Sequence, residues 1–465
     1  MELINQIISS VNSFFWDFAL LILLCGTGVF FTIRLKFVQI RKLGQGFKSV
    51  FGGFSLKGKA AGKDGMSSFQ SLATAVAAQV GTGNLAGAAT AIISGGPGAI
   101  FWMWISAFFG MATIFAEAVL GQKFKKTVNG EVTGGPVYYI TSAFKGKFGK
   151  VLAGVFAVLL IFALGFIGNM VQSNSISDAF STAFHIPPYV TGIVVALLVG
   201  IIFFGGVKRI AAVTEKIVPV MAFLYIIGAV IVIAFNYQHI GGAFKSIFVC
   251  AFAPSSVFGG VAGVTVQKAV RFGIARGLFS NEAGMGSTPH AHAIAKVKHP
   301  CEQGFVAMIG LFIDTFVILT LTALVILTSN LNLADYAGKG IALTQDAFGN
   351  LFGQVGYMFI AVCLLFFAFS TIIGWFFFGQ TNIKYLFGQK GVKVYTLLVI
   401  VFVFIGSTLK VDLVWSLSDL FNGMMVIPNL LALLALSGVV AKLEKSYLPG
   451  PPKEKRKGKK KVSSK

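Results

Sequence analysis

Polar residues and glycines interrupt a long apolar stretch of the chain near position 80. The residues are Gln79, Gly81, Thr82, Gly83 and Asn84. Two glycines within three residues disfavour a helix, so the backbone should unwind there. In a membrane, unwound backbone is tolerated only where its free N–H and C=O groups line a cavity or meet a ligand. The pattern therefore predicts a site for a small polar ligand or an ion.

A second stretch has the same character. It runs Ser280-Asn281-Glu282-Ala283-Gly284-Met285-Gly286. Residues 84–87 and 281–284 both match N-x-A-G, at an offset of 197 positions. Ala78 and Ala275 are identical at the same offset. The two stretches are therefore candidates for equivalent positions in an internal repeat.

The composition places both stretches in a membrane protein. Of the 465 residues, 56% are hydrophobic and 12% are charged, and the mean hydropathy is +0.82. Soluble domains carry about 25% charged residues, so a soluble fold of this composition would lack a polar surface. The four cysteines have no paired spacing and are expected to be apolar fillers, not disulfides or metal ligands.

Eleven apolar stretches are long enough to cross about 30 Å of hydrocarbon as helices. They cover residues 14–33, 68–94, 98–121, 150–175, 188–206, 211–235, 262–292, 304–329, 355–380, 394–409 and 416–440. The seventh is the least hydrophobic and contains the second glycine-rich stretch. The first is preceded by Glu2 with no basic segment before it, and it contains Asp17, so we expect a retained helix and not a signal peptide.

Lysine and arginine are distributed unevenly between the loops. Loops on one side of the alternating spans hold 32 of the 38 Lys and Arg residues, and loops on the other side hold three. The positive-inside rule then predicts a plasma-membrane protein with its N-terminus outside and its C-terminus in the cytoplasm. In segment 34–67, apolar residues recur at helical spacing among basic residues, which suits a helix lying in the cytoplasmic lipid interface. The alternative is a plain basic loop. The basic tail 441–465 is expected to face anionic lipid, so the net charge of +22 does not indicate nucleic-acid binding.

The spans group into two sets of five. Residues 68–236 and 257–440 each open with a glycine-interrupted span, and residues 1–33 form an extra N-terminal helix. Because five is odd, the second set runs with opposite topology, which is the inverted repeat of secondary transporters. In that architecture the ligand site lies at the two broken helices near the middle of the bilayer. The alternative is that Gly83 and Gly87 form a packing face of the small-xxx-small type.

Two motifs resemble those of a known family. Residues 95–107, G-G-P-G-A-I-F-W-M-W-I-S-A, closely resemble the signature of the alanine/glycine:cation (sodium:alanine) symporters. Residues 280–286 resemble a second hallmark of that family, and the similarity runs from about residue 14 to 440. The resemblance implies an all-α membrane protein of the LeuT type, with a five-plus-five inverted repeat and one extra N-terminal helix. It also implies Na⁺-driven uptake of alanine or glycine.

The resemblance implies a sodium site made of neutral oxygen atoms. Residues 80–84 resemble the broken first core helix of that fold, and residues 368–371 resemble the stretch that supplies two hydroxyl ligands. The implied ligands are the carbonyls of Ala77, Val80 and Phe367 and the hydroxyls of Ser370 and Thr371. Neutral oxygens suit a small hard cation and release it more easily than a carboxylate does. Without the resemblance, both hydroxyls would be expected to bond back to a carbonyl one turn earlier.

The residues expected to contact the substrate surround the two breaks. They are Gln79, Thr82, Gly83, Asn84, Asn169, Gln172, Phe272, Phe279, Asn281 and Trp375. Backbone N–H groups of residues 82–84 begin a half-helix whose positive end would hold the substrate carboxylate. The side chain of Gln79 and carbonyls between residues 272 and 281 would accept from the substrate ammonium group.

Three of these residues lie on other spans. Trp375 follows Thr371 by one helical turn and would cap the pocket, leaving room for a methyl group at most. The alternative is that Trp375 belongs to the belt of aromatic residues at the membrane interface. Asn169 and Gln172 share one helix face and either contact the substrate or join neighbouring helices.

Other classes of protein fit the sequence less well. Motifs of intramembrane hydrolases are missing, and a channel would need a filter or a charged ring. A proton-coupled carrier, or a carrier of another small solute, is the alternative within the fold, with Glu282 as its titratable group. Arg276, Glu282, Glu117 and Asp314 are expected to be paired or to act in gating, with partners that the sequence does not assign. We expect no organic cofactor and no obligate protein partner.

Overall fold

The computed structural model describes residues 10–51, 66–253, 265–409 and 411–448. Parts of four predicted segments lie outside the described residues: 1–9 of the N-terminal segment, 52–65 of the interfacial segment, 257–264 at the start of the second repeat and seventh span, and 449–465 of the basic tail.

The described chain is built from helices and one small hairpin. The first half contains η1 (Phe15–Ala19), α2 (Leu20–Arg34), α3 (Val38–Arg41), α4 (Leu43–Phe51), α5 (Ser68–Gln79), η2 (Gly83–Gly87), α6 (Ala88–Gly95), α7 (Gly98–Lys123), β1 (Lys126–Val128), β2 (Glu131–Thr133), α8 (Pro136–Ala143), α9 (Gly146–Leu160), η3 (Ile161–Gly168), α10 (Asn169–Phe184), α11 (Pro188–Phe203) and α12 (Gly206–Phe235). The second half contains η4 (Tyr237–His239), α13 (Ile240–Cys250), α14 (Val266–Asn281), α15 (Pro289–Ala293), α16 (Pro300–Leu311), η6 (Phe312–Leu319), α17 (Thr320–Thr328), η7 (Leu333–Tyr336), α18 (Gly340–Phe352), α19 (Gln354–Thr408), α20 (Val411–Ala435) and α21 (Ser437–Ser446). β1 and β2 pair antiparallel, with Lys126 opposite Thr133.

Six helices of the described residues are long and apolar enough to cross a membrane. In this count α9 and α10 form one helix with the π-helical turn between them, and so do α16 and α17. α5 together with η2 and α6 makes a seventh span, bent by 45°. α2 and α11 are shorter apolar helices. Within α19, Gly388 has a φ of 68° and separates the two spans expected there. The all-helical membrane fold is as predicted, whereas the number of eleven spans stays a prediction.

The first glycine-rich stretch is a break between helices, as predicted. α5 starts with a capping box in which the Ser67 side chain accepts from the Gln70 N–H and the Gln70 side chain accepts from the Ser67 N–H. It ends at Val80, whose ψ of 90° is extended. Val80 and Gly81 lie outside the helix, and η2 continues the chain at the new angle.

The second glycine-rich stretch is also a break. α14 ends at Asn281, and Glu282 takes the left-handed conformation with a φ of 58°. Gly284 and Gly286 follow with φ values of 91° and 79°, which glycine adopts without the steric cost of a Cβ. α15 then resumes the helical path at Pro289.

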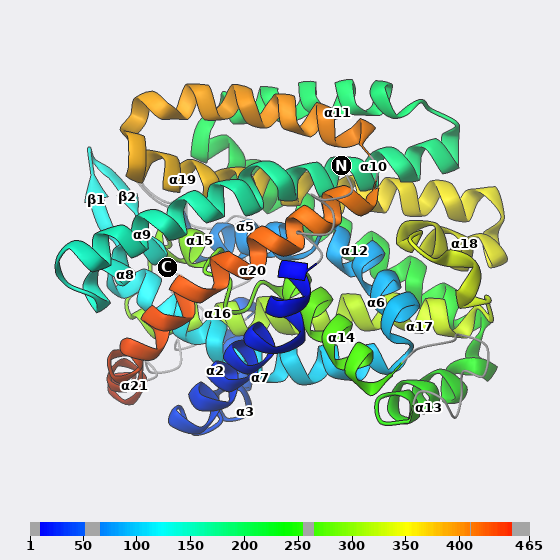
Figure 1. Ribbon diagram of the computed structural model, residues 1–465, viewed down its shortest axis with the longest axis horizontal. Helices are drawn as coiled ribbons and strands as arrows, with labels where there is room; N and C mark the ends of the chain where they lie inside the picture. The colour runs from blue at the N-terminus through cyan, green and yellow to red at the C-terminus, as the bar shows by residue number, and fades with distance from the viewer. Residues whose placement is uncertain (1–9, 52–65, 254–264, 410, 449–465) are drawn as a thin grey trace, which may run out of the picture.

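The loops of the two predicted sides lie at opposite ends of the molecule. Figure 1 shows the β1–β2 hairpin, α8 and α21 towards one end, and α13 and α18 towards the other. The first group belongs to segments predicted inside, and the second group to segments predicted outside. The predicted alternation of the spans is therefore consistent with the positions of these loops. Which end faces the cytoplasm stays a prediction.

Small residues allow α5 and α19 to approach closely. A Cβ on Gly374 would lie 2.9 Å from the Cβ of Ala78, and a Cβ on Gly81 would lie 2.3 Å from the hydroxyl oxygen of Thr371. Lipid tails are as apolar as leucine, so helices in a membrane associate through close packing and hydrogen bonds. The glycines thus bring the end of α5 against the middle of α19.

Candidate functional site

Five oxygen atoms meet where α5 ends against α19. The hydroxyl of Thr371 donates to the carbonyl oxygens of Ala77 at 2.9 Å and Val80 at 3.4 Å. The hydroxyl of Ser370 lies 3.3 Å from the carbonyl oxygen of Ala77. The Phe367 carbonyl oxygen, one turn back, also lies within hydrogen-bonding distance of both hydroxyls, 3.1 Å from that of Thr371 and 2.9 Å from that of Ser370, so each hydroxyl has several acceptors for its one hydrogen. The fold thus brings together all five groups expected at a sodium ion, and the back-bonding expected as the alternative is present as well.

The break in the helix is what frees two of these carbonyls. In a continuous helix the carbonyl of Ala77 would accept from Gly81 N–H, and that of Val80 from Asn84 N–H. Instead, Gly81 N–H donates to the side-chain oxygen of Asn84 at 3.0 Å, and Asn84 N–H donates to the Gly81 carbonyl at 3.2 Å. The short polar side chain of Asn84 therefore satisfies the backbone locally and leaves both carbonyls available to other partners.

Gln172 of α10 reaches the beginning of the second half-helix. Its side-chain oxygen accepts from Thr82 N–H at 3.1 Å. Within the described residues, neither the Gln172 side-chain nitrogen nor the Thr82 hydroxyl has a hydrogen-bond partner, and both are buried. A Cβ on Gly81 would lie 3.1 Å from the Gln172 oxygen and 2.3 Å from the Thr371 hydroxyl. The amide therefore lies directly beside the five oxygens, with unused hydrogen-bonding capacity.

Asp314 of η6 connects the two breaks. Its carboxylate accepts from the Asn84 side-chain nitrogen at 2.7 Å, from the Ser280 hydroxyl at 3.0 Å to each oxygen, and from the Thr315 hydroxyl at 2.9 Å. The side chain is completely buried, and no basic side chain of the described residues pairs with it. Asn84 belongs to the first break and Ser280 to the end of α14, so the carboxylate joins the two halves of the repeat.

Glu117 of α7 supports the second break. Its carboxylate accepts from the N–H groups of Gly284 at 3.2 Å and Gly286 at 2.9 Å, and from the side-chain nitrogen of Asn429 at 2.7 Å. Asn429 in turn donates to the Gly284 carbonyl and accepts from the Tyr139 hydroxyl. These contacts take the place of the helical partners that the unwound backbone has lost. The partner that the sequence left open for Glu117 is therefore the unwound segment itself.

Trp375 is enclosed by protein on all sides. It is 1% exposed, which excludes the interfacial-belt alternative. Its indole N–H donates to the carboxylate of Glu282, and its ring packs edge-on against Phe279 at 5.7 Å. A Cβ on Gly168 would lie 2.6 Å from the indole, so only glycine leaves room for the ring there. Glu282 also accepts from the Ser287 hydroxyl.

The other expected contact residues lie at different distances from the breaks. The Gln79 side chain donates to the Asn281 carbonyl at 2.8 Å, which links the two breaks directly. The side-chain nitrogen of Asn169 donates to the Gly165 carbonyl of its own helical run at 3.0 Å, and its buried side-chain oxygen has no hydrogen-bond partner within the described residues. Phe272 lies more than two turns before the end of α14, where it lines a cleft near the predicted outer side.

That cleft has a volume of about 360 Å³ and is called the outer cleft below. Residues that line it include Thr90, Asp178, Arg276, Lys339, Trp415 and Asp419. Arg276 forms two hydrogen bonds with the carboxylate of Asp419, at 2.6 and 2.8 Å. The Arg276 guanidinium also lies over the ring of Trp415, at 4.8 Å. Asp419, which the sequence analysis did not single out, is thus the partner of Arg276.

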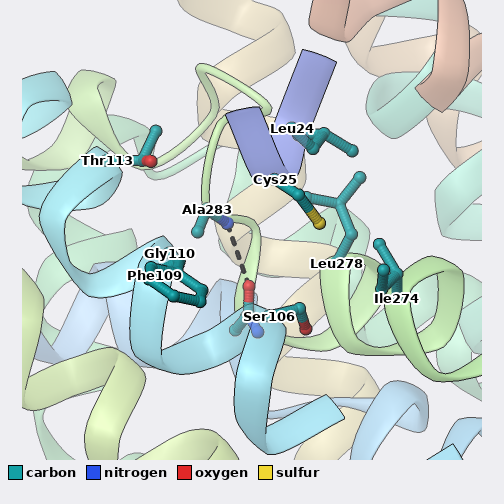
Figure 2. Close-up of a pocket in the computed structure, with 10 residues that line it drawn as sticks. Leu24, Cys25, Ser106, Phe109, Gly110, Thr113, Ile274, Leu278 and Ala283 are labelled. Atoms are coloured by element: carbon teal, nitrogen blue, oxygen red, sulfur yellow. Dashed lines mark hydrogen bonds between the residues drawn. The ribbon is translucent and has the colours of Figure 1, made fainter. Parts of the chain in front are cut away.

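A narrower cavity reaches the second break from the side of the extra N-terminal helix. Figure 2 shows it between α2, α7 and α14, with Leu24 and Cys25 on one side and Phe109 and Gly110 on another. Inside it, the Asn281 side-chain oxygen accepts from Ala283 N–H at 3.1 Å. None of the five residues that supply the oxygens lines this cavity, so it is a separate feature.

Three π-helical stretches surround the site, and no sequence pattern predicted them. η2 follows the first break, η3 precedes Asn169, and η6 contains Asp314. π-Helical turns are uncommon and are found frequently at functional sites. Asp314 and Glu117 had a sequence signal, namely a lone acid in an apolar span, whereas Ser280 and Thr315 could not be distinguished from ordinary helical hydroxyls.

Comparison with known proteins adds to this geometry. The family model described as the sodium:alanine symporter family matches residues 1–464. The sodium/alanine symporter AgcS of Methanococcus maripaludis is 43% identical over 448 residues, which cover 95% of this chain and 97% of that protein. The probable sodium/glutamine symporter GlnT of Bacillus subtilis is 41% identical over 448 residues, which cover 96% of this chain and 91% of that protein.

A solved structure of the same fold is the transporter MhsT in complex with L-phenylalanine. It superposes with a TM-score of 0.57 at 16% identity, covering 83% of this chain and 98% of MhsT. At that identity the likeness concerns the fold alone, and it agrees with the predicted LeuT-type architecture.

Proposed function

Because the chain belongs to the sodium:alanine symporter family, we propose that it carries a small neutral amino acid, alanine or glycine, into the cell together with Na⁺ by alternating access. The protein is a membrane transporter and not an enzyme. We further propose a plasma-membrane location with the N-terminus outside, which the distribution of Lys and Arg supports.

The proposed sodium site is the group of five neutral oxygens between α5 and α19. The observation that carries it is the convergence of the Ala77 and Val80 carbonyls on the hydroxyls of Ser370 and Thr371. Three carbonyls and two hydroxyls offer Na⁺ hard oxygen ligands without a negative charge. When the ion binds, each hydroxyl turns its hydrogen away and presents a lone pair, so the ion replaces the hydrogen bonds that join the helices.

The proposed substrate site adjoins the ion at the start of η2. The substrate carboxylate is placed at the N–H end of this half-helix, where the backbone dipole favours negative charge. The Gln172 amide and the Thr82 hydroxyl, with their unused hydrogen-bonding capacity, supply further contacts. The Gln79 side chain and the carbonyl of Asn281 are acceptors for the ammonium group. Glycine at position 83 lets the two breaks that border this site pack closely, because a Cβ there would lie 2.9 Å from the Cα of Ser280.

Coupling between the ion and the substrate follows from their shared backbone. Val80 supplies a carbonyl to the sodium site, and Thr82, two residues later, supplies an N–H at the substrate site. Ordering this short unwound segment for one ligand lowers the cost of ordering it for the other, which is positive coupling between two sites. The same reasoning requires each ligand to raise the affinity for the other.

Selection for small side chains is assigned to Trp375. Its ring is fixed by Glu282, Phe279 and the space at Gly168. Glutamine is the second candidate substrate, since one relative carries the description of a probable sodium/glutamine symporter. A fixed indole over the site favours alanine or glycine over glutamine.

The test is uptake of labelled alanine into proteoliposomes that contain the purified chain. We expect accumulation with an inward Na⁺ gradient and none when choline replaces Na⁺ at one pH. Unlabelled glycine should compete strongly, glutamine weakly, and leucine or phenylalanine hardly at all. Equal uptake in Na⁺ and choline would rule out sodium coupling, and a pH gradient that drives uptake alone would favour the proton-coupled alternative.

A further inference from the structure

The C-terminal helix α21 contacts the short helices near the start of the chain. The carboxylate of Glu444, whose side chain is 12% exposed, accepts from the Arg41 guanidinium at 3.0 Å. The Gln45 side chain donates at 3.0 Å to the hydroxyl of Tyr447, the residue that follows α21. Each of these contacts joins positions more than 400 residues apart. The end of the last helix is therefore attached to α3 and α4.

The end of α21 also covers the beginning of α16. The ring of Tyr447 lies 5.2 Å from the ring of His299 and packs edge-on at 5.2 Å against Phe305, which is completely buried. The Ser446 hydroxyl lies 3.5 Å from Nε2 of the same histidine. His299 caps α16, because its Nδ1 accepts from the Cys301 N–H at 3.3 Å. α21 thus contacts both the cap of α16 and its first turns.

α4 packs closely against the same helix. A Cβ on Gly46 would lie 2.8 Å from the side chain of Ile309. The ring of Phe47 packs edge-on against Phe312, just after α16, at 5.6 Å. α4 and α21 are joined to each other and both rest on α16, so they hold its beginning in place together.

The first turns of α16 also hold the ends of α5 and α15, through Gln303. The side-chain nitrogen of Gln303 donates to the Ser68 hydroxyl of α5 at 3.2 Å, and its side-chain oxygen lies 2.9 Å from Nδ1 of His292 in α15. The Ser71 hydroxyl of α5, 3.4 Å from the same oxygen, donates to the Ala291 carbonyl of α15 at 2.8 Å. One buried side chain thus joins the half-helix before the first break to the half-helix after the second.

Both of these half-helices lie on the side of the breaks that is predicted to face the cytoplasm. In the proposed function Na⁺ leaves towards the cytoplasm, and its ligands are divided between the end of α5 and α19. Release therefore requires the inner end of α5 to move away from its neighbours. Resting on that function, we propose that α21 is a latch, formed by Glu444, Ser446 and Tyr447. It fixes the beginning of α16 and so keeps the inner ends of α5 and α15 closed.

The contacts of the latch are of a kind that can open in each transport cycle. The Arg41 side chain is 42% exposed, so its ion pair with Glu444 is partly screened by water and salt. Tyr447 adds one hydrogen bond and two ring contacts. Contacts of these kinds shift a two-state equilibrium by a few-fold each. The latch therefore favours the closed inner end without blocking its opening.

The test measures how often the inner end of α5 opens. Ala75 lies one turn after Ser71 on the same helix face and is 1% exposed. A cysteine introduced by Ala75→Cys therefore becomes accessible when α5 moves away from α15. Its labelling by a charged maleimide is followed in the full-length protein in nanodiscs, and the labelling of the protein without this cysteine is subtracted.

Loss of the latch should expose the introduced cysteine more often. We expect Glu444→Ala to raise its labelling rate about two- to threefold, and Glu444→Ala with Tyr447→Ala to raise it about tenfold, because an ion pair and ring contacts are lost together. Na⁺ with alanine should slow the labelling in every variant, because the bound ion joins α5 to α19.

Three further variants make the result specific. Arg41→Gln removes the same ion pair from the other partner and should reproduce E444A, which guards against a folding defect of E444A alone. Glu444→Gln keeps an oxygen acceptor for Arg41 and should stay near the parent rate. Glu131→Ala breaks an ion pair with Lys384 on the same predicted side, between β2 and α19, and should label as the parent does.

The outcomes separate this inference from the proposed function. Equal labelling of the parent, R41Q and the variant that combines E444A with Y447A overturns the latch, and so does an equal rise in E131A. A rise that Na⁺ and alanine do not suppress, in protein that still takes up alanine, shows general loosening of the fold and also overturns it. Absence of Na⁺-dependent alanine uptake by the parent overturns the proposed function instead, whatever the labelling rates are.

Discussion

The two breaks are equivalent in the repeat but are stabilised by different chemistry. The first break satisfies its own backbone with the neutral side chain of Asn84, and Gln172 adds a second neutral amide. The second break depends on the carboxylate of Glu117, which accepts from two of its N–H groups. At the first break the carbonyls of Ala77 and Val80 lie against the Thr371 hydroxyl, and at the second break the N–H groups of Gly284 and Gly286 lie against Glu117. A carboxylate therefore contacts the backbone directly only at the second break, whereas at the first break the Asp314 carboxylate acts through the side chain of Asn84.

The largest effect is expected from removing the carboxylate of the second break. Glu117→Ala leaves two buried N–H groups and the side chain of Asn429 without their acceptor. Leaving one buried donor without its partner typically costs about 1–3 kcal/mol, and three donors lose their acceptor here, so a large part of the protein should fail to fold. Thermal unfolding and size-exclusion chromatography of the purified protein would measure this. Glu117→Gln keeps one oxygen acceptor and should lose less stability, and an E117A protein as stable as the parent would contradict the assigned role.

A smaller effect is expected where the two breaks touch. In Gly83→Ala the new Cβ would lie 2.9 Å from the Cα of Ser280, so the backbone of one break must shift. Overpacking of this kind costs about 1–3 kcal/mol and should lower uptake markedly. Gly87→Ala is the matched control, because its Cβ would meet only the Thr82 carbonyl oxygen, at 3.8 Å. If both variants transported equally well, glycine would not be required at position 83, either for a small-xxx-small packing face or for the contact between the breaks.

Removal of one proposed ion ligand should be milder still. Thr371→Val keeps the shape of the side chain and deletes a hydroxyl that faces Ala77 and Val80. We expect about a tenfold rise in the Na⁺ half-saturation concentration for uptake, comparable to the loss of one hydrogen bond of about 1.4 kcal/mol. Thr396→Val is the control, since that hydroxyl bonds only within α19 among the described residues, to Val392. An unchanged Na⁺ dependence in T371V would remove Thr371 from the site.

The smallest change is expected in selectivity. Trp375→Ala opens space beside Gly168 and leaves the oxygens in place. Larger neutral amino acids should then compete with labelled alanine, and alanine itself should bind several-fold more weakly, as pocket contacts of one or two methylenes are worth about 1–3 kcal/mol. A competition series from glycine to leucine would measure this. Leucine remaining as poor a competitor as in the parent would show that Trp375 does not border the substrate.

The position of the breaks was predictable from local sequence. Glycine pairs at 81 and 83 and at 284 and 286 lie in otherwise apolar spans, and the cost of glycine in a helix is a local property. The five oxygens were named from the resemblance to a known family, and the fold brings each of the three carbonyls within hydrogen-bonding distance of at least one of the two hydroxyls. Their role in binding Na⁺ stays a prediction. Phe272 shows the limit, because it lies more than two turns before the second break and lines the outer cleft instead.

The partners of the buried charges could not be predicted. Arg276 pairs with Asp419, which is 143 positions away, and Glu117 supports residues 167 and 169 positions away. Each of these acids and bases is costly in an apolar span, so the sequence indicated that each would be paired. Which partner each one found depended on how the two repeats are packed together.

The sequence by itself determined that the chain is a helical membrane protein with two broken spans, because hydropathy and glycine content act over a few helical turns. It also indicated the family, through two continuous motifs. Only the tertiary structure decided that Asp314 joins the two breaks, that Trp375 is held by Glu282, and that the Arg276–Asp419 ion pair lines a cleft outside them. Those contacts join segments that are remote in the chain, and their distances are set by helix packing, which no local pattern encodes.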